Sequence, residues 1–138
     1  MNKETEALLI QKAIDARKKS YSPYSSFSVG AALLTSNGNI FTGANIESAS
    51  FSPTVCAERV AFFTAVHNGE REFSAIAVVG GRSSEEVSSY CAPCGVCRQV
   101  MREFCDSDFE IILFDGRSPK TFTLSELLPE SFGSSDMK

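Results

Sequence analysis

The run Ser28-Val-Gly-Ala-Ala-Leu-Leu-Thr-Ser-Asn-Gly-Asn-Ile-Phe-Thr-Gly-Ala-Asn45 indicates the architecture of this chain. Residues Ser28 to Thr35 are apolar and compact, which is typical of a buried strand. Ser36-Asn37-Gly38-Asn39 is a hairpin signal, so Ile40 to Asn45 is predicted to be the returning strand. The sheet is therefore expected to include a hairpin over residues 28–45.

Helices are predicted on both sides of this hairpin in the sequence. Apolar residues recur at spacings of three and four between Glu4 and Ser20, which predicts a helix there. A second helix should start at Ser52-Pro53 or Thr54, where capping residues occur, and stop at Asn68-Gly69. This second helix is apolar nearly all round, so we expect it to be buried.

The second half of the chain adds elements of both kinds. We expect, in order, a strand over Ala75–Val79, a polar loop over Gly80–Ser89, a helix over Cys94–Cys105, a strand over Phe109–Phe114, a short strand over Lys120–Thr123 and a helical turn over Ser125–Leu128. Helices and strands alternate along the chain, which favours a mixed sheet with helices on both faces. The prediction is one three-layer α/β/α domain with a mixed five-stranded sheet, spanning residues 1–138.

The composition is that of an ordinary globular domain and argues against some partners. The 138 residues are long enough for one sizeable core, with 43% hydrophobic and 22% charged residues. The formal net charge of −4 argues against nucleic acid or an anionic membrane, because no basic surface is available to neutralise phosphates. No stretch could span a membrane and the N-terminus is polar, so we expect a cytoplasmic protein. In that compartment five cysteines favour metal binding or catalysis over disulfides.

Two cysteine-containing segments carry the predicted chemistry. Cys56-Ala57-Glu58 and Pro93-Cys94-Gly95-Val96-Cys97 together match the pattern of a zinc nucleobase-deaminase site, with Cys in place of His as the first ligand. Thiolates bind zinc tightly, and an open fourth position would hold a water whose pKa the metal lowers. A nearby glutamate could then move protons. The two segments therefore predict a catalytic zinc site.

Local geometry places a condition on this site. Cys94 and Cys97 share a face in the first helical turn after Pro93, where the helix dipole favours thiolate. Residues two apart in a helix point to nearly opposite sides, so Cys56 and Glu58 can serve one site only if Cys56 lies at the helix entrance. Three thiolates give zinc a net charge of −1, which the neighbouring Arg59 would offset by donating hydrogen bonds to them.

A structural zinc site is the alternative for these cysteines. Cys91-x-x-Cys94-x-x-Cys97 is a competing triple, but it leaves Cys56-Ala57-Glu58 without a role. Cys105 is expected to be an ordinary buried thiol. His67, the only histidine, lies near the end of the second helix and receives no chemical role.

Five segments, in this order, carry a resemblance to the small zinc-dependent cytidine deaminases. They are Ser22-Pro-Tyr-Ser-Ser-Phe-Ser-Val-Gly-Ala-Ala-Leu-Leu34, Asn45-Ile-Glu47, Cys56-Ala-Glu-Arg59, Pro93-Cys-Gly-Val-Cys-Arg-Gln99 and Glu126-Leu-Leu-Pro129. The resemblance covers nearly the whole chain. It implies the deaminase fold and hydrolytic deamination of cytidine and 2′-deoxycytidine to uridine and 2′-deoxyuridine with release of ammonia, a pyrimidine-salvage reaction. In that reaction a zinc-bound hydroxide would be the nucleophile.

The resemblance also implies a role for individual residues. It implies that Cys56, Cys94 and Cys97 bind Zn²⁺, that Glu58 is the proton shuttle and that Arg59 neutralises thiolates. For the substrate, it implies that Asn45 and Glu47 hold the ribose hydroxyls. It also implies that Phe27 packs against the pyrimidine and that the backbone around Ala57 binds the base edge. Phe51 and Phe132 fall where the family has aromatic residues near the substrate. Phe51 departs from the common Tyr, so a hydroxyl contact to the sugar is lost.

The assembly and two rival functions complete the expectations. The resemblance implies a homotetramer whose nucleoside sites are completed by neighbouring subunits. One rival is a deaminase of another amine, such as an aminonucleoside antibiotic, guanine or a tRNA base; Asn45-Ile-Glu47 and the lack of a basic surface argue against it. The other is a zinc-stabilised binding protein without turnover, which would leave Glu58 and Arg59 unexplained.

Overall fold

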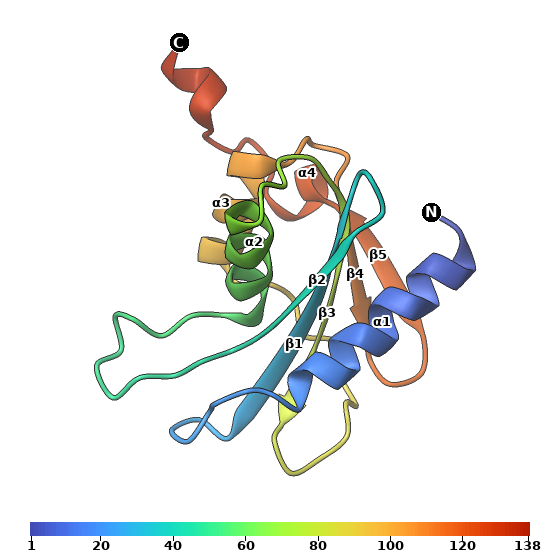
Figure 1. The fold of residues 1–138 in the computed structure, drawn as a ribbon, viewed down its shortest axis with the longest axis vertical. Coiled ribbons are helices and arrows are strands. Elements are labelled where there is room, and N and C mark those ends of the chain that lie inside the picture. The colour runs from blue at the N-terminus through green and yellow to red at the C-terminus, as the bar shows by residue number, and fades with distance from the viewer.

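A single mixed sheet forms the centre of the molecule in the computed structural model, which describes residues 1–138 (Figure 1). Its strands are β1 (Phe27–Thr35), β2 (Ile40–Ala44), β3 (Phe73–Arg82), β4 (Glu110–Phe114) and β5 (Pro119–Thr123), in the spatial order β2-β1-β3-β4-β5. Only β3 and β4 pair in parallel, and the other three pairs are antiparallel. The mixed five-stranded sheet and the hairpin are as predicted.

Helices cover both faces of this sheet. They are α1 (Lys3–Arg17), α2 (Ala57–His67), α3 (Gly95–Phe104), the short α4 (Leu124–Leu127) and a terminal 3-10 helix (Ser134–Met137). Figure 1 shows α1 across one face of the sheet, while α2 and α3 pack together against the other. The three-layer prediction is confirmed. None of the helices combines the length and apolar character that crossing a membrane would need.

Each face of the sheet has its own core. On the α1 face, Leu9 and Ala13 pack against Ala77 and Ile112. The core on the other face is larger and contains the aromatic cluster around the fully buried Phe62 of α2. Cys97 of α3 belongs to this second core, so the predicted metal site is anchored in the larger of the two cores.

Two glycines of the hairpin let helices approach the sheet closely. A Cβ on Gly30 of β1 would lie 2.0 Å from the Ala13 carbonyl oxygen of α1. A Cβ on Gly43 of β2 would lie 2.4 Å from the Ala57 carbonyl oxygen and 2.6 Å from the Ala61 nitrogen of α2. These backbone atoms cannot move aside cheaply, so only glycine fits. Gly43 therefore fixes where α2 starts.

Several predicted boundaries are wrong, and α2 differs most. It begins at Ala57 and not at Ser52-Pro53 or Thr54, because the preceding segment pairs with the chain after β2 through a bridge between Val55 and Ile46. Its outer face is also less covered than predicted, since Phe63 is 49% exposed.

The remaining boundary errors are smaller. The first helix ends at Arg17, three residues earlier than predicted, and β3 extends to Arg82, so the polar loop starts at Ser83. The last α-helical turn begins one residue early, at Leu124, where Thr123 and Glu126 form a capping box. The C-terminal 3-10 helix was not predicted, and Figure 1 shows it projecting from the body of the molecule.

Candidate active site

Three cysteines from two helix starts converge on one point. Cys56 is the extended residue immediately before α2, and Cys94 holds the same position before α3. Cys97 follows in the first turn of α3. The three Sγ atoms all lie within 4.8 Å of one another, and those of Cys56 and Cys94 are 3.7 Å apart. The structure thus assembles the three sulfurs predicted to hold the metal.

The arrangement of these sulfurs fits zinc. Sulfurs bound about 2.3 Å from a tetrahedral zinc lie roughly 3.8 Å apart, close to the 3.7 Å between the Cys56 and Cys94 sulfurs. Hydrogen bonding to Cys97, followed by contacts with Arg59 and Cys94, lowers the pKa of Cys56 to about 5, which favours the thiolate form. No fourth side chain joins the cluster, so a bound zinc would keep one position open. An open position is typical of catalytic rather than structural sites.

Glu58 lies beside the sulfurs in the first turn of α2. Because Cys56 precedes the helix and Glu58 is inside it, both side chains reach the same cavity, as the sequence required. The Glu58 side chain is only 3% exposed. Burial raises the pKa of Glu58 to about 7, a value suited to accepting and returning a proton near neutral pH.

Arg59 provides positive charge next to the sulfurs. Its Nη2 donates a hydrogen bond to Cys56 Sγ at 3.4 Å. Burial opposes the charge on Arg59, but hydrogen bonds with Cys56 and Cys97 raise its pKa overall. Its Nε is buried without a hydrogen-bond partner, which is a cost that the adjacent thiolates would offset. This is the contact predicted for Arg59.

A cavity of about 330 Å³ opens in front of Glu58 and the cysteines. It is mainly apolar, with polar groups from three separate segments of the chain. Among the predicted site residues it brings together Phe27, Asn45, Glu47, Cys56, Glu58 and Cys94. Its remaining lining residues are Ser25, Val29, Thr54, Val55, Cys91 and Ala92, and of these only Cys91 was considered as a site residue from the sequence, as a ligand of the alternative zinc site. The cavity is of the size that small-molecule sites have.

Asn45 stabilises the edge of this cavity through three side-chain hydrogen bonds. Its Oδ1 accepts hydrogen bonds from Val29 N at 2.8 Å and Ser20 Oγ at 2.6 Å. Its Nδ2 donates to the Phe27 carbonyl at 2.8 Å, leaving one amide hydrogen free. Asn45 therefore holds the start of β1 in place and still has one donor available beside the cavity.

Glu47 lies next to Asn45 and binds the turn before β1. Its Oε1 accepts hydrogen bonds from Tyr24 N at 2.9 Å and Ser25 N at 3.1 Å, and its Oε2 accepts one from Ser25 Oγ. The hydrogen bond from the Ser25 hydroxyl, together with those from the two backbone amides, lowers the pKa of Glu47. The carboxylate therefore remains ionised at the mouth of the cavity.

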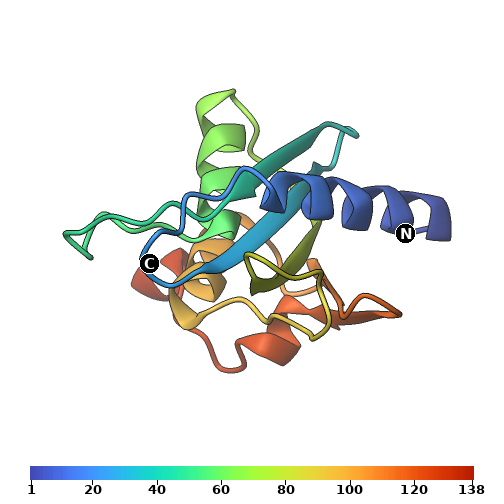
Figure 2. The same cartoon turned by 90° about the horizontal axis from the view of Figure 1, so that it is seen from below.

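Ala57 and the two other predicted aromatic residues do not line the cavity. Ala57 is fully buried, and its backbone lies between Cys56 and Glu58 at the start of α2, where helix N–H groups lack intrahelical partners. Phe51 lies in the long loop of residues 45–56, which Figures 1 and 2 show protruding from the body. Phe51 and Phe132 are 78% and 60% exposed, so within one chain neither contacts the site.

The competing cysteine triple is not assembled. Cys91 lines the cavity but is not part of the sulfur cluster, and a Cβ at Gly80 would lie 2.7 Å from its Sγ. Burial raises the pKa of the Cys91 thiol to about 11, so it stays protonated. Cys105 is buried in the core at the end of α3, as predicted for an ordinary thiol.

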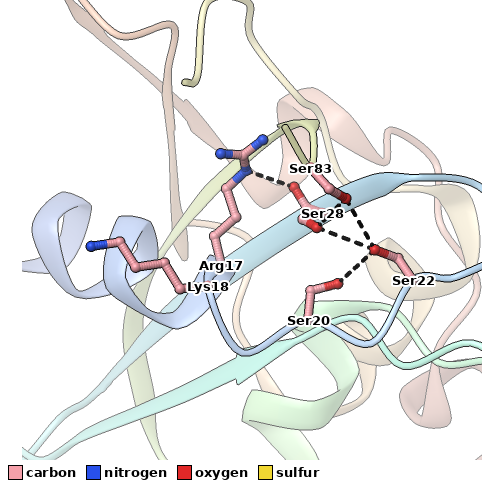
Figure 3. A pocket seen from close by; sticks show the side chains of 6 residues that line it. All are labelled: Arg17, Lys18, Ser20, Ser22, Ser28 and Ser83. Atoms are coloured by element: carbon pink, nitrogen blue, oxygen red, sulfur yellow. Dashed lines mark hydrogen bonds between the residues drawn. The ribbon is translucent and has the colours of Figure 1, made fainter. Parts of the chain in front are cut away.

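A second hollow is lined by Arg17, Lys18 and four serines (Figure 3). All of its serine hydroxyls are hydrogen-bonded to one another, and Ser20 continues the network to Asn45. Arg17 donates to three backbone carbonyls, including that of Ser28. Because the serine hydroxyls and the Arg17 guanidinium already make hydrogen bonds within the protein, the residues around this hollow stabilise the cavity edge at Asn45.

Comparisons with known proteins agree on one family. The family model described as the cytidine and deoxycytidylate deaminase zinc-binding region matches residues 3–113. A cytidine deaminase of Halalkalibacterium halodurans is 47% identical over 94% of this chain and 96% of its own length, and one of Sporosarcina psychrophila is 43% identical over 94% and 92%. The crystal structure of a cytidine deaminase from Burkholderia pseudomallei superposes with a TM-score of 0.83 at 44% identity, covering 96% of this chain and all of that one.

Proposed function

This chain belongs to the cytidine and deoxycytidylate deaminase family of zinc-dependent enzymes, and we propose that it hydrolyses cytidine and 2′-deoxycytidine to uridine and 2′-deoxyuridine with release of ammonia. Cys56, Cys94 and Cys97 would hold the zinc. A bound zinc would act as a Lewis acid and lower the pKa of a water molecule in its open position. Residues 1–138 would act as one catalytic domain around this site.

Glu58 is the proton shuttle in this proposal. Its buried carboxylate accepts a proton from the attacking water and delivers one to N3 of the cytosine ring. It then takes the proton of the hydroxyl now on C4 and transfers it to the departing amine as the C4–N bond breaks, so that water and cytidine give uridine and ammonia. The pKa of about 7 supports this role, because the carboxyl group can both take and give a proton at neutral pH. Arg59 offsets the charge of the thiolates.

The sugar and base are assigned to the rest of the cavity. The free amide hydrogen of Asn45 and the carboxylate of Glu47 would bind ribose hydroxyls, which suits a nucleoside and rejects a polynucleotide linked through the same oxygen. Phe27 would pack on the pyrimidine ring, and the backbone around Ala57 would bind the base edge. The placement of Phe27, Asn45, Glu47 and Glu58 around one cavity next to three sulfurs is the observation that carries the proposal.

We further propose that the enzyme is a cytoplasmic homotetramer whose sites are completed by neighbouring subunits. The aromatic side chains of Phe51 and Phe132 support such an assembly, because both are largely exposed in the single chain. The five free cysteines, three of them needed as thiolates, are suited to a reducing compartment.

Ultraviolet absorbance of cytidine incubated with the zinc-loaded protein tests the reaction. We expect conversion to uridine by the wild type, and loss of nearly all turnover in Glu58→Ala with zinc and fold retained. A general acid–base residue contributes about 10²–10⁴-fold, and one used in several steps contributes more. Substantial turnover in Glu58→Ala would refute the shuttle. Absence of conversion by the wild type at full zinc occupancy would refute the substrate and require a panel of other amines.

A further inference from the structure

A serine of the turn before β1 joins two of the proposed substrate contacts. The Ser25 hydroxyl donates its hydrogen bond to Glu47 Oε2 and accepts one from the Phe27 backbone N–H at 3.1 Å. Ser25 also lines the cavity beside both of these residues. One hydroxyl therefore links the carboxylate assigned to the sugar with the residue assigned to the base.

The acceptor positions of Glu47 show what this link controls. A carboxylate offers about four lone-pair positions, two on each oxygen. Two backbone N–H groups fill Oε1, and Ser25 fills one position on Oε2. The single position left for a ligand is on Oε2, the oxygen that Ser25 holds. Ser25 gives its only hydroxyl hydrogen to Glu47 and has none left to donate to a sugar oxygen, so the charged group at this position is the carboxylate that Ser25 orients.

The turn itself needs this support. Ser26, between Ser25 and Phe27, has φ of 57°, a left-handed conformation that is unfavourable for a residue other than glycine. The backbone of Phe27 is held on both sides, by Ser25 at its N–H and by Asn45 at its carbonyl. The Phe27 side chain is 40% exposed, so core packing alone does not fix it. These two hydrogen bonds, together with the pairing of Phe27 with Arg82 of β3, set the place of its backbone.

We propose that Ser25 is a positioning residue for nucleoside binding, whose hydroxyl orients the free lone pair of Glu47 toward the sugar and fixes Phe27 against the base. This inference rests on the proposed function, since it assigns Ser25 a task within the same site. Ser25 takes no part in the chemical step, so its replacement should raise the KM for cytidine and leave kcat nearly unchanged.

Steady-state kinetics of the full-length, zinc-loaded enzyme test the inference. Ser25→Ala should raise the KM for cytidine about tenfold, because a hydrogen bond to a charged group is lost, and change kcat less than about twofold. Ser25→Thr keeps the hydroxyl and should restore most of the affinity. Ser26→Ala is the matched control, because the Ser26 hydroxyl makes no hydrogen bond. An unchanged KM in Ser25→Ala, or an equal increase in the control, would overturn the inference.

A double-mutant cycle separates positioning from general loosening of the turn. In a Glu47→Ala background, Ser25→Ala should raise KM by clearly less than tenfold, because the carboxylate is gone and only the contact with the Phe27 N–H remains. A full additional tenfold increase would show that Ser25 acts independently of Glu47 and would contradict the proposal.

A readout without turnover distinguishes this inference from the proposed function. Carbon-13 NMR titration of Glu47 should show its pKa moving up toward the ordinary range in Ser25→Ala and staying unchanged in Ser26→Ala. An unmoved pKa would overturn the proposed contact. If the wild type failed to convert cytidine, both the proposed function and the role of Ser25 in sugar binding would be refuted. The titration would still decide whether the Ser25 hydroxyl is hydrogen-bonded to Glu47.

Discussion

Arg59 and the three cysteines set the charge of the metal centre. With zinc bound, three thiolates leave the site with one net negative charge, which weakens the metal as a Lewis acid. The guanidinium of Arg59 reaches Cys56 Sγ at 3.4 Å and would reduce the electron density that the sulfur gives to a bound zinc. In the proposed mechanism Arg59 would therefore affect the reaction although it lies outside the substrate cavity.

Replacing Arg59 should lower activity without removing the metal. We expect Arg59→Gln to reduce kcat for cytidine by about 10- to 100-fold, the usual effect of losing a hydrogen-bonding partner of a metal ligand, while zinc per chain stays near one. Arg71→Gln is the control, because Arg71 is exposed and donates only to nearby backbone carbonyls. Equal kcat values for Arg59→Gln and the wild type, measured with zinc content, would refute the role.

The sequence was a good guide to residues whose chemistry is local. Cys56, Glu58 and Cys94 could be predicted because their spacing places them at helix starts, and the structure confirms that geometry. Ser25 could not be predicted, because its importance depends on Glu47, 22 residues away, folding back onto the turn. Cys91 resembled a ligand by spacing alone, but its side chain packs beside Gly80.

At the scale of elements, the contact between β2 and α2 positions half of the metal site. Gly43 allows the first turn of α2 to lie directly on the strand, and Cys56 and Glu58 are placed by that turn. The sequence predicted both elements but started the helix too early, since Ser52 and Pro53 look like a cap. Pairing of Val55 with Ile46 overrides that local preference. Such pairing between distant segments is not visible in a single run of residues.

Gly43→Ala should therefore damage stability and metal binding together. The added methyl group would meet the Ala57 carbonyl at 2.4 Å, and overpacking of this kind costs about 1–3 kcal/mol. We expect a lower free energy of unfolding in denaturant and weaker zinc retention in competition with a chelator. Gly95→Ala is the control, because a Cβ there has no neighbour within 4 Å. Equal losses in both variants would contradict this account.

At the scale of the whole molecule, exposed aromatic residues point to an assembly. Phe51 is on the protruding loop, and Phe132 is near the C-terminus, where Gln99 donates a hydrogen bond to the Phe132 carbonyl and Arg102 donates one to the Ser131 hydroxyl. Both side chains are largely exposed in the single chain, and neither lines the cavity of that chain. The sequence could indicate this only through family resemblance, because residues that face a partner look like ordinary apolar residues.

Sedimentation velocity should show four chains of 14.9 kDa in one particle. We expect Phe51→Asp to dissociate the particle and reduce cytidine turnover, because a charge would be buried at the subunit contact. Leu8→Asp is the control, since Leu8 is an exposed apolar residue on α1, across the sheet from α2. A monomeric wild type with full activity would rule out completion of the site by neighbours.

One zinc, held by Cys56, Cys94 and Cys97, would make this fold a cytidine deaminase. Titration of the metal-free protein with zinc, with cytidine turnover measured at each addition, tests this dependence. We expect no turnover without metal and a linear rise that saturates at one zinc per chain. Turnover in the metal-free protein, or none with one zinc bound per chain, would refute the zinc-dependent reaction.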